Sequence, residues 1–292
     1  MTVAPRRTYT TLTSRGLRHD ILPMRLYHKA KKLGVWDPRD IDLSRDRDDW
    51  LLIPDDPRER LRRLILGFQA GEEAVTVDLL PLVMTVAREG RLEEELFLTT
   101  FLWEEGKHTE FFRRILDEVL QEREDLHEVR APNSGRDLFA DDLPRAMNLL
   151  LTDPSPANQA RASVLYNMII EGVLAETGYF SFFRVLDRFD VMPGLREGLR
   201  YIQRDEARHI AYGVFLISRL VAEHHDLWPV VEERMNELFS IVASNQEQNG
   251  TPEVVREYAK QQFQKRLTRI GRARTQSLEQ IYQLSENEVQ AE

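Results

Sequence analysis

Residues 101–112 read FLWEEGKHTEFF, and the pattern of a glutamate followed three positions later by a histidine recurs at residues 201–213, YIQRDEARHIAYG. The two pairs are Glu105 with His108 and Glu206 with His209. On an α-helix, residues three apart lie on one face, about one turn from each other. Each stretch is therefore predicted to present a carboxylate and an imidazole side by side.

A lone glutamate precedes each stretch at a similar distance. Glu72 lies 33 residues before Glu105, and Glu171 lies 35 residues before Glu206. All six residues fall in apolar stripes with helical spacing, which mark the buried face of a helix. Four such helices facing one axis would place four carboxylates and two imidazoles around two metal ions, the arrangement of di-iron and di-manganese helical bundles.

The alternative is that these glutamates pair with arginine or lysine, or face solvent at helix edges. Unpaired buried carboxylates are costly, and four of them converging without cations would be strongly unfavourable. The metal-site interpretation is therefore preferred. A third pair with the same spacing, Glu124 and His127, lies in a polar run with no apolar face beyond it, and is expected to face solvent.

The composition narrows the chemistry. The chain has no cysteine, so a metal ion must be held by oxygen and nitrogen ligands. Carboxylates with imidazoles suit iron or manganese, whereas zinc usually takes fewer ligands in a tetrahedral site. Asp205, next to Glu206, is a candidate to accept the outer N–H of a ligand imidazole; a surface salt bridge is its alternative role.

Charge and hydropathy exclude other classes. The net charge is −9 and no basic face is evident, which argues against nucleic acid as a partner. The N-terminus lacks the apolar segment of a signal peptide, and no apolar run is long enough to span a membrane. The sequence therefore predicts a cytoplasmic protein.

Helical periodicity predicts an all-α fold with a single domain over residues 1–292. Long helices are expected at about 55–90, 92–126, 156–189 and 194–222, with Pro81 kinking the first of them. Shorter or flanking helices are expected at 24–33, 142–151, 227–247 and 252–284. Residues 1–20 are expected to form an irregular arm, 34–56 an extended acidic connector, and 285–292 a disordered tail.

The run RDEARH at residues 204–209, together with the other glutamate and histidine ligands, resembles the ribonucleotide reductase small-subunit superfamily. The resemblance covers residues 55–225 and implies a ferritin-like four-helix core. It also implies that Asp205 bonds to a metal-bound histidine. One position departs from the usual pattern, because Phe112 stands where most reductase subunits carry a radical-forming tyrosine; a minority of reductases also have phenylalanine there.

The chain resembles more closely the ligand-binding oxidases of this superfamily, through GEEAVTVDLLPL at residues 71–82, FLWEEGKH at 101–108, and Tyr166 with Glu171. The resemblance implies one manganese and one iron ion, with a di-iron pair as the alternative. It also implies a long-chain fatty acid, or a similar apolar acid, with its carboxylate at the metals. Reaction with O2 would join Val75 to Tyr166 through an ether crosslink, and the protein would be a homodimer.

The residue roles follow from these expectations. The first ion, manganese by analogy, is expected at Glu72, Glu105 and His108, and the second, iron, at Glu171, Glu206 and His209, with Glu105 or Glu206 bridging. Val75 and Tyr166 have ordinary core packing as their alternative role, and Tyr179 is either close to the centre or part of the core. Two other functions remain open, a reductase small subunit with phenylalanine at the radical site and a ferritin-like metal-binding protein.

Overall fold

The protein is described by a computed structural model that covers residues 9–122, 137–285 and 288–289. Every regular element in these ranges is helical, which confirms the predicted all-α class. None of the helices in the same ranges is long and apolar enough to cross a membrane. The pair Glu124 and His127 lies outside the described residues.

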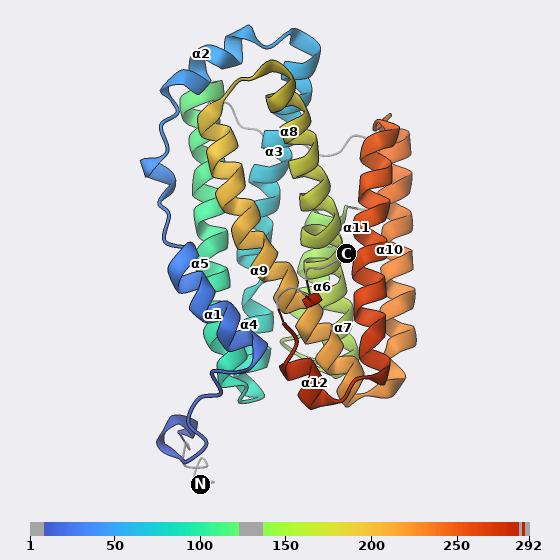
Figure 1. The fold of residues 1–292 in the computed structure, drawn as a ribbon. Coiled ribbons are helices and arrows are strands. Elements are labelled where there is room, and N and C mark those ends of the chain that lie inside the picture. The colour runs from blue at the N-terminus through green and yellow to red at the C-terminus, as the bar shows by residue number, and fades with distance from the viewer. Residues whose placement is uncertain (1–8, 123–136, 286–287, 290–292) are drawn as a thin grey trace.

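Figure 1 shows the order of the helices in the described residues. The α-helices are α1 Leu22–Leu33, α2 Ser44–Leu52, α3 Asp55–Asp78, α4 Leu80–Arg88, α5 Leu92–Arg114, α6 Leu143–Leu149, α7 Pro156–Ser163, α8 Glu176–Phe189, α9 Pro193–Glu223, α10 Trp228–Gln248, α11 Glu253–Gly271 and α12 Leu278–Tyr282. Wider π-helical turns form Ile115–Leu120, Leu138–Asp142 and Val164–Ala175, and short 3-10 turns form Thr10–Leu12, Pro38–Asp40, His225–Leu227 and Arg272–Thr275.

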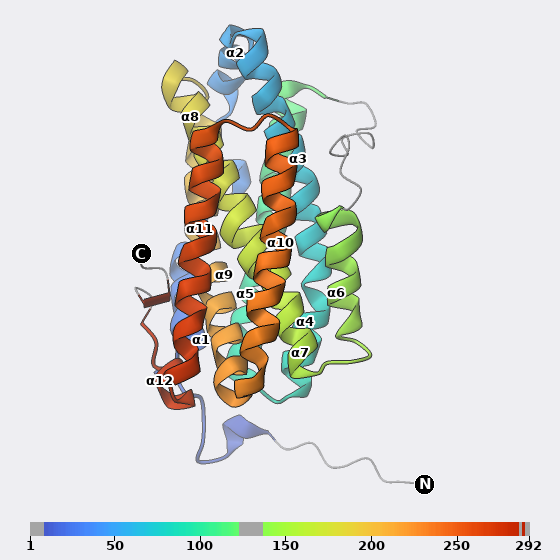
Figure 2. The same ribbon diagram turned by 90° about the vertical axis from the view of Figure 1, so that its right-hand side faces the viewer.

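Four long helical runs form the central bundle, as predicted for a ferritin-like core with flanking helices. They are α3 with α4, α5, the run α7–Val164–Ala175–α8, and α9. Helix α3 packs on α5, and the π-helical segment packs on α9. Helices α10 and α11 lie side by side and cover the π-helical segment on the side away from α5 (Figures 1 and 2). The apolar stripes of these helices meet in the buried core.

The π-helical segment changes the geometry expected around Tyr166. An ideal α-helix would set Tyr166 well to the side of Glu171, because the two are five positions apart. In a π-helix the hydrogen bonds run between residues five apart, so these residues lie nearly above one another. The wider turn therefore brings Tyr166 and Glu171 towards the same face of one continuous helical run.

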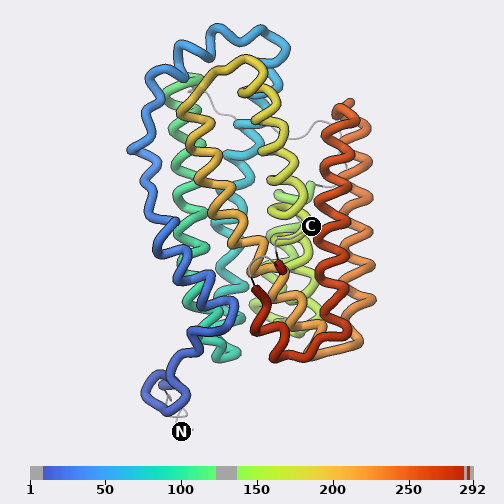
Figure 3. The backbone as a smooth tube through the Cα atoms, viewed as in Figure 1, coloured from blue at the N-terminus to red at the C-terminus, as the bar shows by residue number. Residues whose placement is uncertain are grey.

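Several boundaries differ from the predictions. The break between α3 and α4 falls at Leu79, two residues before Pro81, whose ring lacks the N–H for an interior bond. The 34–56 connector contains helix α2 instead of being extended throughout. The single helix expected at 252–284 divides at residues 272–277, where Ser277 forms a capping box with Gln280 and starts α12 (the chain path is traced in Figure 3).

The described part of the C-terminal tail also differs from the disordered segment expected for residues 285–292. Val289 is buried and belongs to the main apolar core, and the Glu288 carboxylate accepts hydrogen bonds from the Ser285 N–H and hydroxyl. Composition alone predicts disorder here because most of the tail is polar. One apolar side chain with a place to pack is enough to attach it.

Helix α2 holds the start of α9 in place. The buried Asp46 carboxylate accepts hydrogen bonds from the Gly194 and Leu195 backbone N–H groups, at 2.9 and 2.6 Å. Asp49 accepts a third from the Met192 N–H at 2.8 Å. These N–H groups have no partner within their own helix, so the two aspartates act as caps supplied by another helix.

We expect Asp46→Ala to destabilise the protein by about 1–3 kcal/mol, because two buried N–H groups would lose their acceptor. Chemical denaturation monitored by circular dichroism measures the change. The control is Asp48→Ala, which removes an exposed aspartate from the same helix. Equal stability of the two variants would contradict the capping role.

Candidate metal centre

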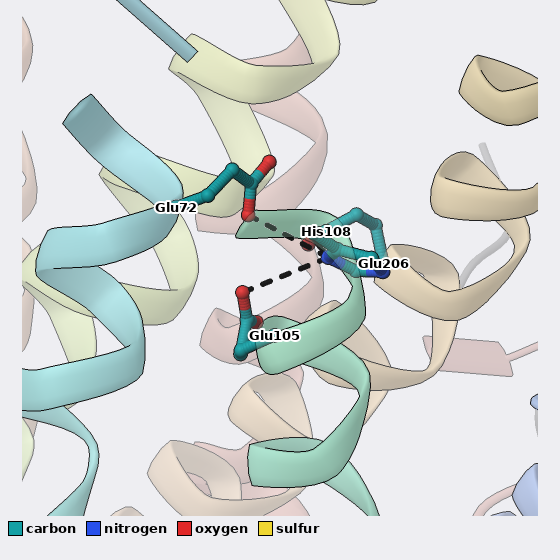
Figure 4. A group of neighbouring side chains, drawn as sticks. All are labelled: Glu72, Glu105, His108 and Glu206. Atoms are coloured by element: carbon teal, nitrogen blue, oxygen red, sulfur yellow. Dashed lines mark ion pairs between the residues drawn. The ribbon is translucent and has the colours of Figure 1, made fainter. Parts of the chain in front are cut away.

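The six predicted ligand residues meet inside the bundle and are all buried. The first group surrounds the Nδ1 atom of His108: Glu206 Oε1 lies 3.3 Å from it, Glu72 Oε2 3.5 Å and Glu105 Oε2 3.6 Å. Figure 4 shows how α3, α5 and α9 direct these side chains towards one point. Four ligand atoms from three helices thus face one small volume, all within 4.8 Å of one another.

The second group surrounds the Nδ1 atom of His209. Glu105 Oε1 lies 3.0 Å from it, Glu206 Oε2 3.6 Å and Glu171 Oε1 4.0 Å. Glu105 and Glu206 each contribute one oxygen to the first group and the other oxygen to the second. This geometry suits two ions bridged by carboxylates.

The oxygen and nitrogen atoms of the two groups are better suited to binding metal ions than to hydrogen bonding with one another. Buried atoms with no hydrogen-bond partner among the described residues gather at this point, although nearly all buried polar atoms in proteins are paired. They are both oxygens of Glu105, Glu171 Oε1, Glu206 Oε2, and the Nδ1 atoms of His108 and His209. These six unpaired oxygen and nitrogen atoms are of the types that bind iron and manganese. Two bound cations would explain why they have no hydrogen-bond partner.

The carboxyl groups of the cluster differ in proton affinity. Burial raises the pKa of Glu72 to about 8 and raises that of Glu171 well above its usual value. At Glu105 burial also acts to raise the pKa, but the two neighbouring imidazoles, His108 and His209, outweigh it and lower the pKa to about 2. Two imidazoles cannot neutralise four carboxylates, so protons or metal ions must balance the rest.

Each histidine is held from behind by an acid on the opposite helix. His108 of α5 lies with its Nε2 3.5 Å from Oδ2 of Asp205 on α9. His209 of α9 lies with its Nε2 2.9 Å from Oε2 of Glu104 on α5. Because a carboxylate only accepts, each Nε2 carries the proton and each Nδ1 presents its lone pair to the centre.

Cations tie the two acids together. Arg208, fully buried, donates to Glu104 Oε1 and to Asp205 Oδ1, at 2.5 Å in both cases. Lys107 donates to Asp205 Oδ2 at 3.2 Å. Burial acts to raise the pKa of Asp205, but His108 and these two cations outweigh it and hold the pKa well below its usual value. Asp205 therefore stays an anion that orients His108.

Hydrogen bonds also fix Glu171. Asn167 donates from Nδ2 to Glu171 Oε2 at 3.0 Å and accepts from the Ser163 hydroxyl at 2.7 Å. The Asn167 side chain fits only because Gly213 of α9 has none, since a Cβ at Gly213 would lie 2.2 Å from the Cβ of Asn167. The close approach of the π-helical segment to α9 thus depends on this glycine.

The structure also places Val75 and Tyr166 together beside the centre. The Tyr166 hydroxyl donates to the Val75 carbonyl oxygen at 3.0 Å, and Tyr166 is fully buried. Burial, followed by the charges of Glu105 and Glu171, raises its pKa well above the usual value, so the phenol is neutral. Tyr179 is fully buried against Phe68, and its hydroxyl has no hydrogen-bond partner in the part of the chain that the structure describes.

A cavity of about 350 Å³ opens from the metal-ligand cluster. Four of the six ligands reach its inner end: Glu72, Glu105, Glu171 and Glu206. Most of its remaining wall is apolar, with Phe68, Val75 and Phe139 on one side and Ile170 and Leu174 on the other. A long apolar molecule with one anionic end would suit this shape.

The sequence contains a pattern that indicates the acids and cations behind the two histidines. The runs EEGKH at 104–108 and DEARH at 205–209 match in charge at every ionisable position. Asp205 was predicted, but the equivalent Glu104, and the equivalent cations Lys107 and Arg208, were not. Aligning the two runs with each other would have identified all three.

We expect Glu104→Gln to lower metal affinity by about 10–100-fold, chiefly at the His209 half of the site, because His209 loses the anion that orients it. Metal content after dialysis, measured by mass spectrometry of the elements, reports the loss. Glu110→Gln, an exposed position on the same helix, is the matched control. Unchanged metal content in the Glu104 variant would contradict this role.

Comparison with known proteins agrees with this geometry. Residues 24–269 match the family described as ribonucleotide reductase, small chain. The R2-like ligand-binding oxidase from Sulfolobus acidocaldarius is 38% identical, with 94% of this chain and 98% of that chain covered and a TM-score of 0.86.

Two variant structures of R2-like ligand-binding oxidases are also similar. One, with a glycine replaced by phenylalanine and an anaerobically reconstituted Mn/Fe cofactor, is 37% identical, with 89% and 97% covered and a TM-score of 0.84. The other, with a valine replaced by leucine and an aerobically reconstituted Mn/Fe cofactor, is 36% identical over the same shares, with a TM-score of 0.82. The chain belongs to the ribonucleotide reductase small-chain family and, within it, to the R2-like ligand-binding oxidases.

Proposed function

We propose that this protein is an O2-dependent oxidase with one manganese and one iron ion. The proposal rests on six buried oxygen and nitrogen atoms that lack hydrogen-bond partners among the described residues. They converge in two groups that share Glu105 and Glu206. The Mn/Fe cofactors of similar structures support the identity of the ions. By analogy, manganese belongs with Glu72 and His108, and iron with Glu171 and His209.

The protein's own residues set up the site for oxidation chemistry. When bound, the two ions would supply the activation of O2 and two of the four electrons that reduce it to water. Glu104 and Asp205 hold the imidazoles, and Asn167 holds Glu171, so the ligands are oriented before an ion arrives. The buried apolar wall keeps water from the reacting atoms.

We propose a long-chain fatty acid, or a similar apolar acid, as the ligand. The predicted metal ligands line only the inner end of the cavity, so the carboxylate of the acid belongs at the ions and its hydrocarbon chain along Phe68, Ile170 and Leu174. Burial of the hydrocarbon against these side chains supplies the affinity. Metal-free protein would bind the same acid poorly, because no cation would face its carboxylate at the inner end.

The contact between Val75 and Tyr166 supports an internal ether crosslink. Its formation breaks the Val75 Cβ–H and Tyr166 O–H bonds, makes one Cβ–O bond, and releases two protons and two electrons. Dioxygen is the oxidant and accepts these electrons together with the two from the ions. Tyr166 is suited to this step because its hydroxyl is fixed at the Val75 backbone, 3.0 Å from the carbonyl oxygen.

A reductase small subunit is the competing function within the family. Phe112 is fully buried against Phe68, and a phenyl ring has no hydroxyl to form a tyrosyl radical. The oxidase proposal predicts joined Val75 and Tyr166 peptides, whereas a reductase subunit or a ferritin-like metal store would keep them separate.

We expect one crosslinked pair of tryptic peptides, lighter by two hydrogens than their sum, after loading with manganese and iron in air. Intact-peptide mass spectrometry detects it, with elemental analysis to show that both ions are present. Tyr166→Phe removes the acceptor oxygen and should abolish the link. Tyr179→Phe, in the same tryptic peptide, should retain it; separate peptides in metal-loaded wild-type protein would refute the crosslink.

We also propose that the protein is a homodimer. Val77, Leu80 and Met84 lie on one side of the α3–α4 junction and are 62%, 47% and 46% exposed. Apolar side chains spaced three and four apart on the outside of a bundle are suited to packing against a second copy.

Replacing both Leu80 and Met84 by glutamate should shift the mass in light scattering from two copies to one, since charges would be buried in the interface. Val254→Glu provides the control, because Val254 is 44% exposed on α11, a different helix. A wild-type monomer would refute the dimer, and a dimer that survives both charges would move the interface elsewhere.

A further inference from the structure

The cavity continues outward along α3, beyond the part that touches the metal ligands. Its lining on this helix recurs every three or four residues, as expected for one face: Arg63, Leu64, Gly67, Phe68, Gly71, Glu72 and Val75. At 1.5 Å per residue, this face is about 18 Å long. The cavity is therefore elongated, with the ion ligands at one end and the surface at the other.

The outer end lies between α3 and the connection from α10 to α11. Gln246 at the end of α10, Thr251 in the connection and Val255 at the start of α11 line it. Arg63, on the first half of α3, is largely exposed. The Arg63 Nε donates to Glu59 at 2.8 Å, so its charge is already paired. Nothing in this contact favours an anion at the outer end.

The wall between the two ends offers hydrocarbon rather than free hydroxyls. The Thr177 hydroxyl donates to the Val173 carbonyl at 2.6 Å, and the Ser181 hydroxyl donates to the Thr177 carbonyl at 2.9 Å. Both donors are satisfied within their own helix. A ligand chain in this part would meet methyl and methylene groups and would need no polar atoms of its own.

Gly67 differs from the other glycines of the cavity. A Cβ at Gly71 would touch Phe139 at 3.4 Å, and the space beside Gly178 is filled by Phe68, 2.3 Å from an added Cβ. At Gly67 an added Cβ would meet no atom of the described residues within 4 Å. Glycine is an unfavourable residue inside a helix, and neither a positive φ nor close packing against any described residue requires it here.

We propose that Gly67 determines the longest chain the cavity accepts, by leaving its outer end open for the far end of an unbranched acid. The proposal rests on the proposed binding of an apolar acid. It assigns the ligand class more narrowly: unbranched, long-chain monocarboxylic acids with an apolar far end that passes Gly67. The position lies five residues, about 7.5 Å along the helix, outward of Glu72.

The test compares octanoic and palmitic acid with metal-loaded wild-type, Gly67→Phe and Gly67→Ala protein. We expect Gly67→Phe to weaken palmitic acid by about tenfold or more in calorimetry, while octanoic acid binds as to wild type. Gly67→Ala adds one methyl group and should bind both acids as wild type does. Acids extracted from the purified Phe variant should also be shorter than those from wild type, by mass spectrometry.

Gly106→Phe is the matched control, because an added Cβ there also meets nothing within 4 Å but the residue does not line the cavity. Its affinity for palmitic acid should be unchanged. If Gly67→Phe does not fold, Gly67→Leu replaces it with a smaller block and the same expected order. Equal binding of palmitic acid by the blocked variant and wild type would overturn the role of Gly67, whereas wild type that binds neither acid would overturn the proposed ligand itself.

Discussion

The structure depends on how the repulsion among four buried carboxylates that face one another is compensated. Glu72, Glu105, Glu171 and Glu206 come from separate helical runs, and the apolar core around them offers no solvent to screen their charges. Such a cluster is stable only with compensating cations or protons. The bundle is thus built to bring unfavourable charges together, and the binding of metal ions is the event that makes the arrangement favourable.

The second constraint is the reciprocal support of the two histidines. Each imidazole is oriented by an acid from the other helix, and Arg208 joins both acids. A shift of α5 relative to α9 by one residue would break both supports at once. The same contacts that orient the ligands therefore fix the register of the two helices, so metal geometry and fold stability cannot be varied independently.

The sequence predicted the parts of the site that depend on spacing. The six candidate ligands could be predicted because glutamate and histidine residues interrupt apolar stripes at helical intervals, and Asp205 because it adjoins one of them. Glu104 was missed although its run, EEGKH, matches DEARH at residues 205–209, because helical spacing alone does not show which acid faces a histidine of another helix. The π-helical turns around Tyr166 were missed because the hydrogen-bond register of a helix has no clear effect on the spacing of its apolar residues. Helix α2 was missed because its sequence is mostly polar and lacks an apolar stripe, and the capping role of its two aspartates depends on α9.

Glu105 and Glu206 each offer one oxygen to either half of the centre. An ion that settles in one half therefore fixes two side chains that its neighbour also needs. Occupancy of the halves is thermodynamically coupled, and the coupling must be equal in both directions. The ion bound in one half would thus affect which element the other half prefers, so selectivity belongs to the pair of ions rather than to either ligand set alone.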